Sequence, residues 1–111
     1  MSEPKYIKKD WGGIDRHVQA NGVIVDELYI ESGKSCSRHR HAATTNYFIV
    51  IDGTLIITTN DDAETVITEQ TLLCGDSMEV KPGEWHRFEA VDDVHAIEVM
   101  HSHPDGDIER A

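Results

Sequence analysis

Short runs of β-branched and aromatic residues, separated by turn-forming residues, dominate the hydrophobic pattern of the chain. Residues 23–30 and 44–51 are the clearest runs, and glycine or an Asp-Gly pair flanks each of them. Runs of this composition and length predict strands. Shorter runs extend the series to residues 35–41, 54–59, 65–68, 78–80, 87–90 and 94–100. No segment of ten or more residues has helical periodicity, so the pattern predicts an all-β sandwich or barrel.

The sharpest turn signal is the Asp52-Gly53 pair, which lies between the runs 44–51 and 54–59. An Asp-Gly pair in that position predicts a hairpin that joins the two strands. Residues 1–20 are polar, so an irregular N-terminal segment is expected there. The chain of 111 residues is then one domain, with this segment, a barrel over 21–101 and a tail over 102–111.

Alternation along residues 44–51 predicts which side chains leave the barrel. If Asn46 faces the interior, then Tyr47, Ile49 and Ile51 face outward, because successive strand residues point to opposite faces. An outward apolar stripe needs a cover. We expect a second copy of the chain to supply it in a homodimer, with the N-terminal segment as the alternative cover.

The charge of the chain excludes one large class of partner. Acidic residues outnumber basic ones by 21 to 10, which gives a formal net charge of −11. A protein that follows a nucleic-acid backbone needs a basic patch. Apart from Lys8-Lys9 the sequence has none, so no nucleic-acid partner is expected.

Hydropathy and cysteine content bear on the compartment. No stretch of about 18 apolar residues is present to span a membrane. Residues 1–5 lack the pattern of a secretory signal. Cys36 and Cys74 are too few for a disulfide framework. We therefore expect a reduced, cytoplasmic protein without a membrane partner.

The candidate chemistry lies in three histidines. His39 and His41 are two residues apart, so in a strand their imidazoles point to the same face. His86 follows the Pro82-Gly83 turn and offers a third imidazole. Three histidine ligands would hold one divalent ion, such as Zn, Mn, Fe or Ni, and leave coordination positions open for water or substrate. The other histidines are expected at the surface, including the tail pair His101 and His103.

The stretches around these histidines resemble the paired motifs of the cupin superfamily. The order and spacing of both motifs fit at Gly33, His39, His41, Gly53, Gly75, Gly83 and His86. The resemblance implies a single cupin jelly-roll β-barrel with metal ligands at the three histidines. Asn46 stands where the family usually has a glutamate ligand, which makes it the candidate fourth ligand.

Asn46 changes the expected charge of such a site. An amide is neutral, so a divalent ion held by three neutral imidazoles and Asn46 would keep its full charge of +2. The ion would then attract anions strongly and be held more weakly than in a site with a carboxylate. We therefore expect a small anionic ligand.

Within the superfamily, the chain is similar to the C-terminal cupin domain of type II mannose-6-phosphate isomerases. Residues 9–12, 46–54, 82–87, 97–99 and 105–110 carry this resemblance. It implies a sugar-phosphate isomerase that works through a metal-stabilised enediolate. Glu98 is the candidate proton carrier, since a carboxylate within an apolar strand has a raised pKa. Glu98 could instead face solvent, and Glu84 beside Trp85 is the weaker candidate.

Two other functions stay open at this point. One is a metal-dependent oxygenase or lyase of small organic acids, which would use the same histidines with iron. The other is a sugar- or effector-binding module without turnover, because the cupin fold hosts many functions.

Overall fold

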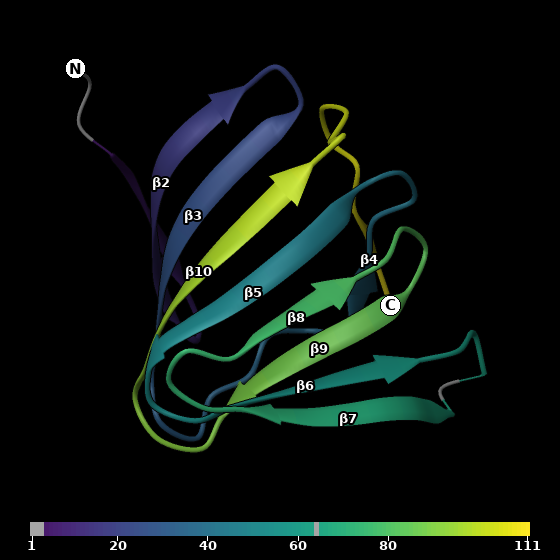
Figure 1. The fold of residues 1–111 in the computed structure, drawn as a ribbon. Helices are drawn as coiled ribbons and strands as arrows, with labels where there is room; N and C mark the ends of the chain where they lie inside the picture. Colours follow the sequence, from purple (N-terminus) through teal and green to yellow (C-terminus); the bar gives the residue numbers. More distant parts are fainter. Residues whose placement is uncertain (1–3, 64) are drawn as a thin grey trace.

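Two antiparallel sheets make up the computed structural model, which describes residues 4–63 and 65–111 (Figure 1). Their strands are β1 (Lys5–Lys9), β2 (Gly12–Ala20), β3 (Val23–Ile30), β4 (His39–Arg40), β5 (Thr45–Asp52), β6 (Leu55–Asn60), β7 (Val66–Leu72), β8 (Ser77–Val80), β9 (Trp85–Ala90), β10 (Val94–His101) and β11 (Glu109–Arg110). The described residues contain no helix, and hence none that could cross a membrane.

The sheets interleave in the manner of a jelly roll. One has six strands in the order β1-β2-β3-β10-β5-β8, and the other has five in the order β11-β4-β9-β6-β7. In Figure 1 the larger sheet curves over one side of the molecule and the smaller sheet closes the other. The prediction of an all-β jelly roll is confirmed.

The predicted hairpin at Asp52-Gly53 is wrong. Strand β5 belongs to the six-stranded sheet and β6 to the five-stranded sheet, so this turn carries the chain between sheets. Gly53 has a φ of +88°, and a Cβ there would lie 2.2 Å from the carbonyl oxygen of Asp93. Glycine is needed because the crossing packs against another loop, and an Asp-Gly pair alone does not distinguish that crossing from a hairpin.

The prediction of an irregular segment over residues 1–20 is also wrong, although residues 1–3 lie outside the described residues. Strands β1 and β2 form an antiparallel extension of the six-stranded sheet, with Ile14 of β2 opposite Leu28 of β3. Both strands are polar because β1 is the edge strand of the sheet and most residues of β2 are at least partly exposed to solvent. Conversely, the strand expected at 35–41 is only β4 and a bridge from Ser35 to Glu89.

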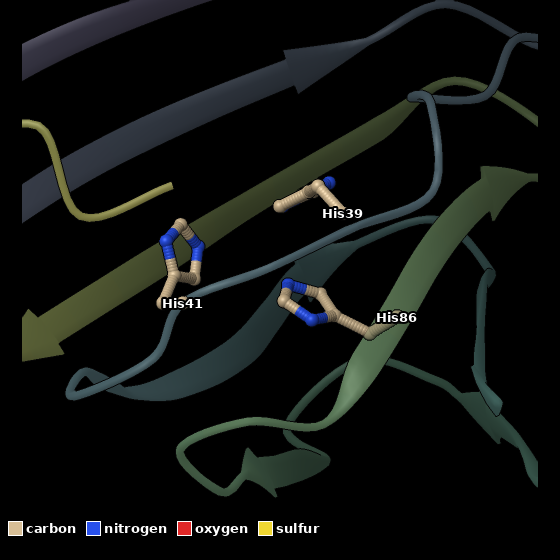
Figure 2. Close-up of side chains that lie close together, drawn as sticks. All are labelled: His39, His41 and His86. Atoms are coloured by element: carbon tan, nitrogen blue, oxygen red, sulfur yellow. The ribbon is translucent and has the colours of Figure 1, made fainter. Parts of the chain in front are cut away.

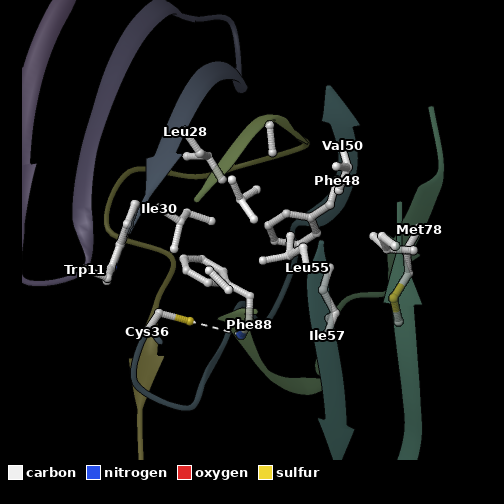
Figure 3. Close-up of a cluster of buried hydrophobic side chains, with 14 of the residues drawn as sticks. Trp11, Leu28, Ile30, Cys36, Phe48, Val50, Leu55, Ile57, Met78 and Phe88 are labelled. Atoms are coloured by element: carbon white, nitrogen blue, oxygen red, sulfur yellow. Dashed lines mark hydrogen bonds between the residues drawn. The ribbon is translucent and has the colours of Figure 1, made fainter. Parts of the chain in front are cut away.

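The apolar core fills the space between the sheets (Figure 3). Trp11 packs edge-on against Phe88 with ring centroids 5.0 Å apart, and Cys36 Sγ accepts a hydrogen bond from the Phe88 amide. The alternation predicted for β5 is confirmed, since Phe48 and Val50 are buried on the inner face. Phe48 also lies against His86, with ring centroids 6.3 Å apart, so the core ends at a histidine.

Candidate metal centre

Three histidines meet on the inner face of the five-stranded sheet (Figure 2). Strand β4 pairs with β9 so that His39 lies opposite His86, and their ring centroids are 4.3 Å apart. His41 follows β4 directly, and its ring lies 5.3 Å from that of His39 and 5.6 Å from that of His86. One ligand nitrogen from each lies within 4.8 Å of the others, as the sequence spacing predicted.

Backbone carbonyls fix which nitrogen each imidazole presents. Nδ1 of His39 lies 2.8 Å from the carbonyl oxygen of Ser37, Nδ1 of His86 lies 3.0 Å from that of Glu84, and Nδ1 of His41 bonds that of Asp107. A carbonyl can only accept, so each Nδ1 carries the proton and each Nε2 keeps its lone pair. This arrangement is the usual one for metal-binding histidines.

The buried Nε2 of His86 tests whether a metal fits. This atom has no hydrogen-bond partner among the described residues, and His86 is only 1% exposed. Leaving a buried polar atom without a partner costs about 1–3 kcal/mol. A cation shared with Nε2 of His39 and His41 would remove that cost, so the cluster fits a divalent ion.

Electrostatics keep the imidazoles in the form that binds metal. Burial is the main cause that lowers the pKa of all three histidines, and it takes that of His86 to about 3 with help from the neighbouring His39. At neutral pH the rings are therefore uncharged, and no proton must leave before a metal binds.

The C-terminal segment contacts the histidine cluster and the residues that follow it. The sequence analysis did not predict these contacts. Strand β11 pairs with β4, and the Asp107 carbonyl oxygen accepts a hydrogen bond from His41 Nδ1. The Asp107 carboxylate also accepts hydrogen bonds from the amides of Ala42 and Ala43 and from the Thr44 hydroxyl. Residues 102–111 thus form part of the site. The Asp-Gly-Asp composition signals a turn, but no local pattern reveals a contact across more than 60 residues.

Two further histidines differ in their placement. His103 was expected at the surface and is half-exposed, but it also borders the site: its Nδ1 lies 2.8 Å from Thr44 Oγ1 and its ring lies 5.7 Å from that of His41. His101 lies outside the site and stacks on Tyr47, which faces outward.

A cavity of about 550 Å³ opens beside the histidines. Glu98 on β10 lines it from the six-stranded sheet, while His39 and His41 line it from the other side. The alternative of a solvent-facing Glu98 is wrong, because the residue is only 8% exposed. Burial, with a smaller contribution from the charge of Asp26, raises the pKa of Glu98 to about 7.

Asn46 is fully buried and contacts Glu98. Its Nδ2 donates a hydrogen bond of 2.7 Å to Glu98 Oε2, while its Oδ1 has no hydrogen-bond partner in the described part of the chain. Asn46 therefore positions the Glu98 carboxyl group, and its Oδ1 is still available to bind a metal ion. Its role as a fourth ligand stays a prediction.

Replacing Asn46 by aspartate is expected to raise metal affinity at least tenfold. If Asn46 lies next to the ion, the change adds a negative charge there, and opposite unit charges about 4 Å apart interact by roughly 4 kcal/mol at an effective dielectric near 20. Part of this gain is offset by repulsion from Glu98. Calorimetric titration with Zn²⁺ measures the change. Thr45→Asp, on the outer face of the same strand, is the matched control and should leave affinity unchanged. An Asn46→Asp protein that binds no better than the parent would place Asn46 away from the ion.

Glu84, the weaker candidate proton carrier, lies outside the cavity. Glu84 Oε1 accepts a hydrogen bond from the Lys81 amide, so it closes the turn before β9 and does not line the cavity. Two of the expected surface histidines, His17 and His95, share Glu27 on the outer face of the larger sheet.

Comparison with known proteins supports the fold. The cupin-domain family model matches residues 27–103. An oxalate oxidase in complex with glycolate superposes with a TM-score of 0.69 at 17% identity, over 80% of this chain and 46% of the other. Oxalate decarboxylase from Bacillus subtilis gives 0.82 at 13%, over 96% and 30%. The capsular polysaccharide assembling protein CapF from Staphylococcus aureus gives 0.84 at 16%, over 99% and 32%.

These similarities to solved structures show the fold of the chain. The chain spans less than half the length of each of those three structures, and at such identities the likeness concerns the fold alone. No curated protein matches the chain. None of the comparisons carries the finer resemblance to mannose-6-phosphate isomerases.

Proposed function

Because the chain belongs to the cupin family and its three clustered histidines fit a divalent ion, we propose a metal-dependent enzyme that moves a proton on a small anionic substrate. The observation that carries this proposal is Glu98, a buried carboxyl group across the cavity from His39 and His41. Buried carboxyl groups with a raised pKa are concentrated at functional sites, and burial raises the pKa of Glu98 to about 7.

The histidines on one wall of the cavity and Glu98 on the other would have different roles in the reaction. A divalent ion held by Nε2 of His39, His41 and His86 would polarise a substrate oxygen. Glu98 can both take and return a proton near neutral pH, which is the property of an efficient general acid–base. Asn46 holds the Glu98 carboxyl group in place through its amide. Isomerisation of an aldose–ketose phosphate pair uses both groups, so we place the activity in that class.

Solvent exchange tests this proposal. The protein is loaded separately with Zn, Mn, Fe or Ni and incubated with a hexose 6-phosphate in deuterated water. Deuterium should enter the carbon next to the carbonyl group, and the metal-free protein should not catalyse this exchange. Oxygen uptake by the iron-loaded protein with a small organic acid would favour an oxygenase instead. Tight ligand binding with neither reaction would indicate a binding module.

We also propose a homodimer formed through the outer face of the six-stranded sheet. Tyr47 and Ile49 are half-buried there, Ile51 is 43% exposed, and Ile97 and Val99 of β10 lie beside them in register. This row forms a continuous apolar face that a second copy would cover. Strands β1 and β2 extend the sheet and do not fold over this row, so they are not the cover.

A charge on that face is expected to dissociate the dimer. Ile49→Glu should halve the mass measured by light scattering at micromolar concentration, because a carboxylate buried in an apolar interface is strongly unfavourable. Ile67→Glu is the matched control, since Ile67 is 60% exposed on β7 of the other sheet and should leave the mass unchanged. A parent protein that is already monomeric would contradict the proposal.

A further inference from the structure

Three cationic side chains line the cavity beside the histidines, and they are not equivalent. Arg16 makes two hydrogen bonds to the Asp26 carboxylate, of 2.9 and 3.0 Å, so its charge is neutralised within the protein. Lys9 and Arg110 form no ion pair with any acid in the part of the chain that the structure describes. Because no ion pair holds them, both charges are available to a ligand in the cavity.

Lys9 and Arg110 reach the cavity from different sheets. Lys9 ends β1, the edge strand of the six-stranded sheet, and Arg110 belongs to β11, the edge strand of the five-stranded sheet. Arg110 lies opposite His39 in the pairing of β11 with β4. The two side chains therefore border the cavity from two walls, next to the candidate metal centre.

The charge balance of the cavity favours an anion. Its acidic lining residues are Asp10, Asp26 and Glu98. Arg16 compensates Asp26. Lys9 and Arg110 therefore balance the charges of Asp10 and Glu98, and a divalent ion at the histidines would give the cavity a net positive charge. A cavity of about 550 Å³ can hold a ligand the size of a sugar phosphate.

We propose that Lys9 and Arg110 form an anion subsite, which binds a phosphate or carboxylate group at one end of a substrate whose other end reaches the histidines. This assignment rests on the proposed function and adds the residues that bind the anionic end of the substrate, while its other end offers oxygen ligands to the ion. The guanidinium of Arg110 matches two oxygens of such a group at once, and Lys9 adds a point charge.

Binding to the metal-free full-length protein tests the subsite without any turnover. The probes are a hexose 6-phosphate, the corresponding hexuronate and the neutral hexose, each titrated by calorimetry. One of the two anions should bind, the neutral sugar should bind at least tenfold more weakly, and higher salt should weaken the anion. Preference between the anions identifies phosphate or carboxylate as the recognised group.

Variants then assign the binding to the two cations. Lys9→Gln and Arg110→Gln should each weaken the anion about tenfold to a hundredfold, as expected for the loss of a charged hydrogen bond. Lys9→Arg should retain most of the affinity. Lys8→Gln is the control on the same strand, and Arg87→Gln is the control on β9; neither residue lines this cavity.

The outcomes separate the subsite from the proposed function. Anion affinity that is unchanged in both Lys9→Gln and Arg110→Gln overturns the subsite, as does the absence of anion binding to both metal-free and metal-loaded protein. Weakened anion binding without deuterium exchange in any substrate leaves the subsite standing and removes the enzyme. Deuterium exchange that proceeds with the same KM in both variants leaves the enzyme standing and removes the subsite.

Discussion

Replacing His86 by alanine is expected to lower the affinity for a divalent ion by about a hundredfold or more. Four-ligand zinc sites contribute about 10–16 kcal/mol, so one ligand is worth roughly 3 kcal/mol. His86 is also the most buried of the three ligands, and its Nε2 has no other partner among the described residues. Calorimetric titration with Zn²⁺ measures the loss directly.

The fold of the His86→Ala protein is checked by its unfolding without metal. Zn²⁺ should raise the unfolding temperature of the parent, since a ligand that binds only the folded state stabilises it, and this rise should disappear in the variant. His101→Ala is the matched control, because His101 stacks on Tyr47 outside the site. If His86→Ala binds metal as well as the parent does, the three-histidine site is wrong and a metal-free binding barrel is the better account.

Replacing Glu98 by glutamine is expected to reduce deuterium exchange by about a hundredfold to ten thousandfold, the usual contribution of a general acid–base. Glutamine has nearly the same shape and can still accept the hydrogen bond from Asn46 Nδ2, so ligand and metal binding should persist. Exchange at the parental rate would exclude Glu98 as the proton carrier.

The same substitution has a second readout in stability. The pKa of Glu98 is raised in the folded protein from 4.5 to about 7, so the folded state binds more protons than the unfolded state between these pH values. The contribution of Glu98 to stability is therefore fully present below about pH 4.5 and is lost as pH rises to about 7. The loss is about 3 kcal/mol. The difference in unfolding free energy between parent and Glu98→Gln should follow this curve, and parallel curves would contradict the buried position of the carboxyl group.

The features that local patterns could predict are those set by strand periodicity. Alternation in β5 placed Phe48 and Val50 inside, and the two-residue spacing placed His39 and His41 on one face. The Pro82-Gly83 turn introduced His86, and strand pairing brought it opposite His39. These predictions succeeded because successive strand residues alternate between faces whatever the partner strand.

The features that failed depend on partners far away in the chain. Asp52-Gly53 has the composition of a hairpin, but the strands on either side pair with different sheets. Strand β2 lacks an apolar run because its outer face meets solvent, and its pairing with β3 stabilises it. Asp107 contacts His41 only after the tail folds back along β4. Long-range pairing decides all three, and local composition does not encode it.

The most direct test of the three-histidine centre is long-range ¹H–¹⁵N NMR of the histidine side chains during a zinc titration. At one equivalent per chain, the Nε2 resonances of His39, His41 and His86 should move to the metal-bound range while their Nδ1 atoms stay protonated. His17, His95 and His101, which lie outside the cluster, should not move. Binding through Nδ1, or shifts at a different set of histidines, would contradict the site.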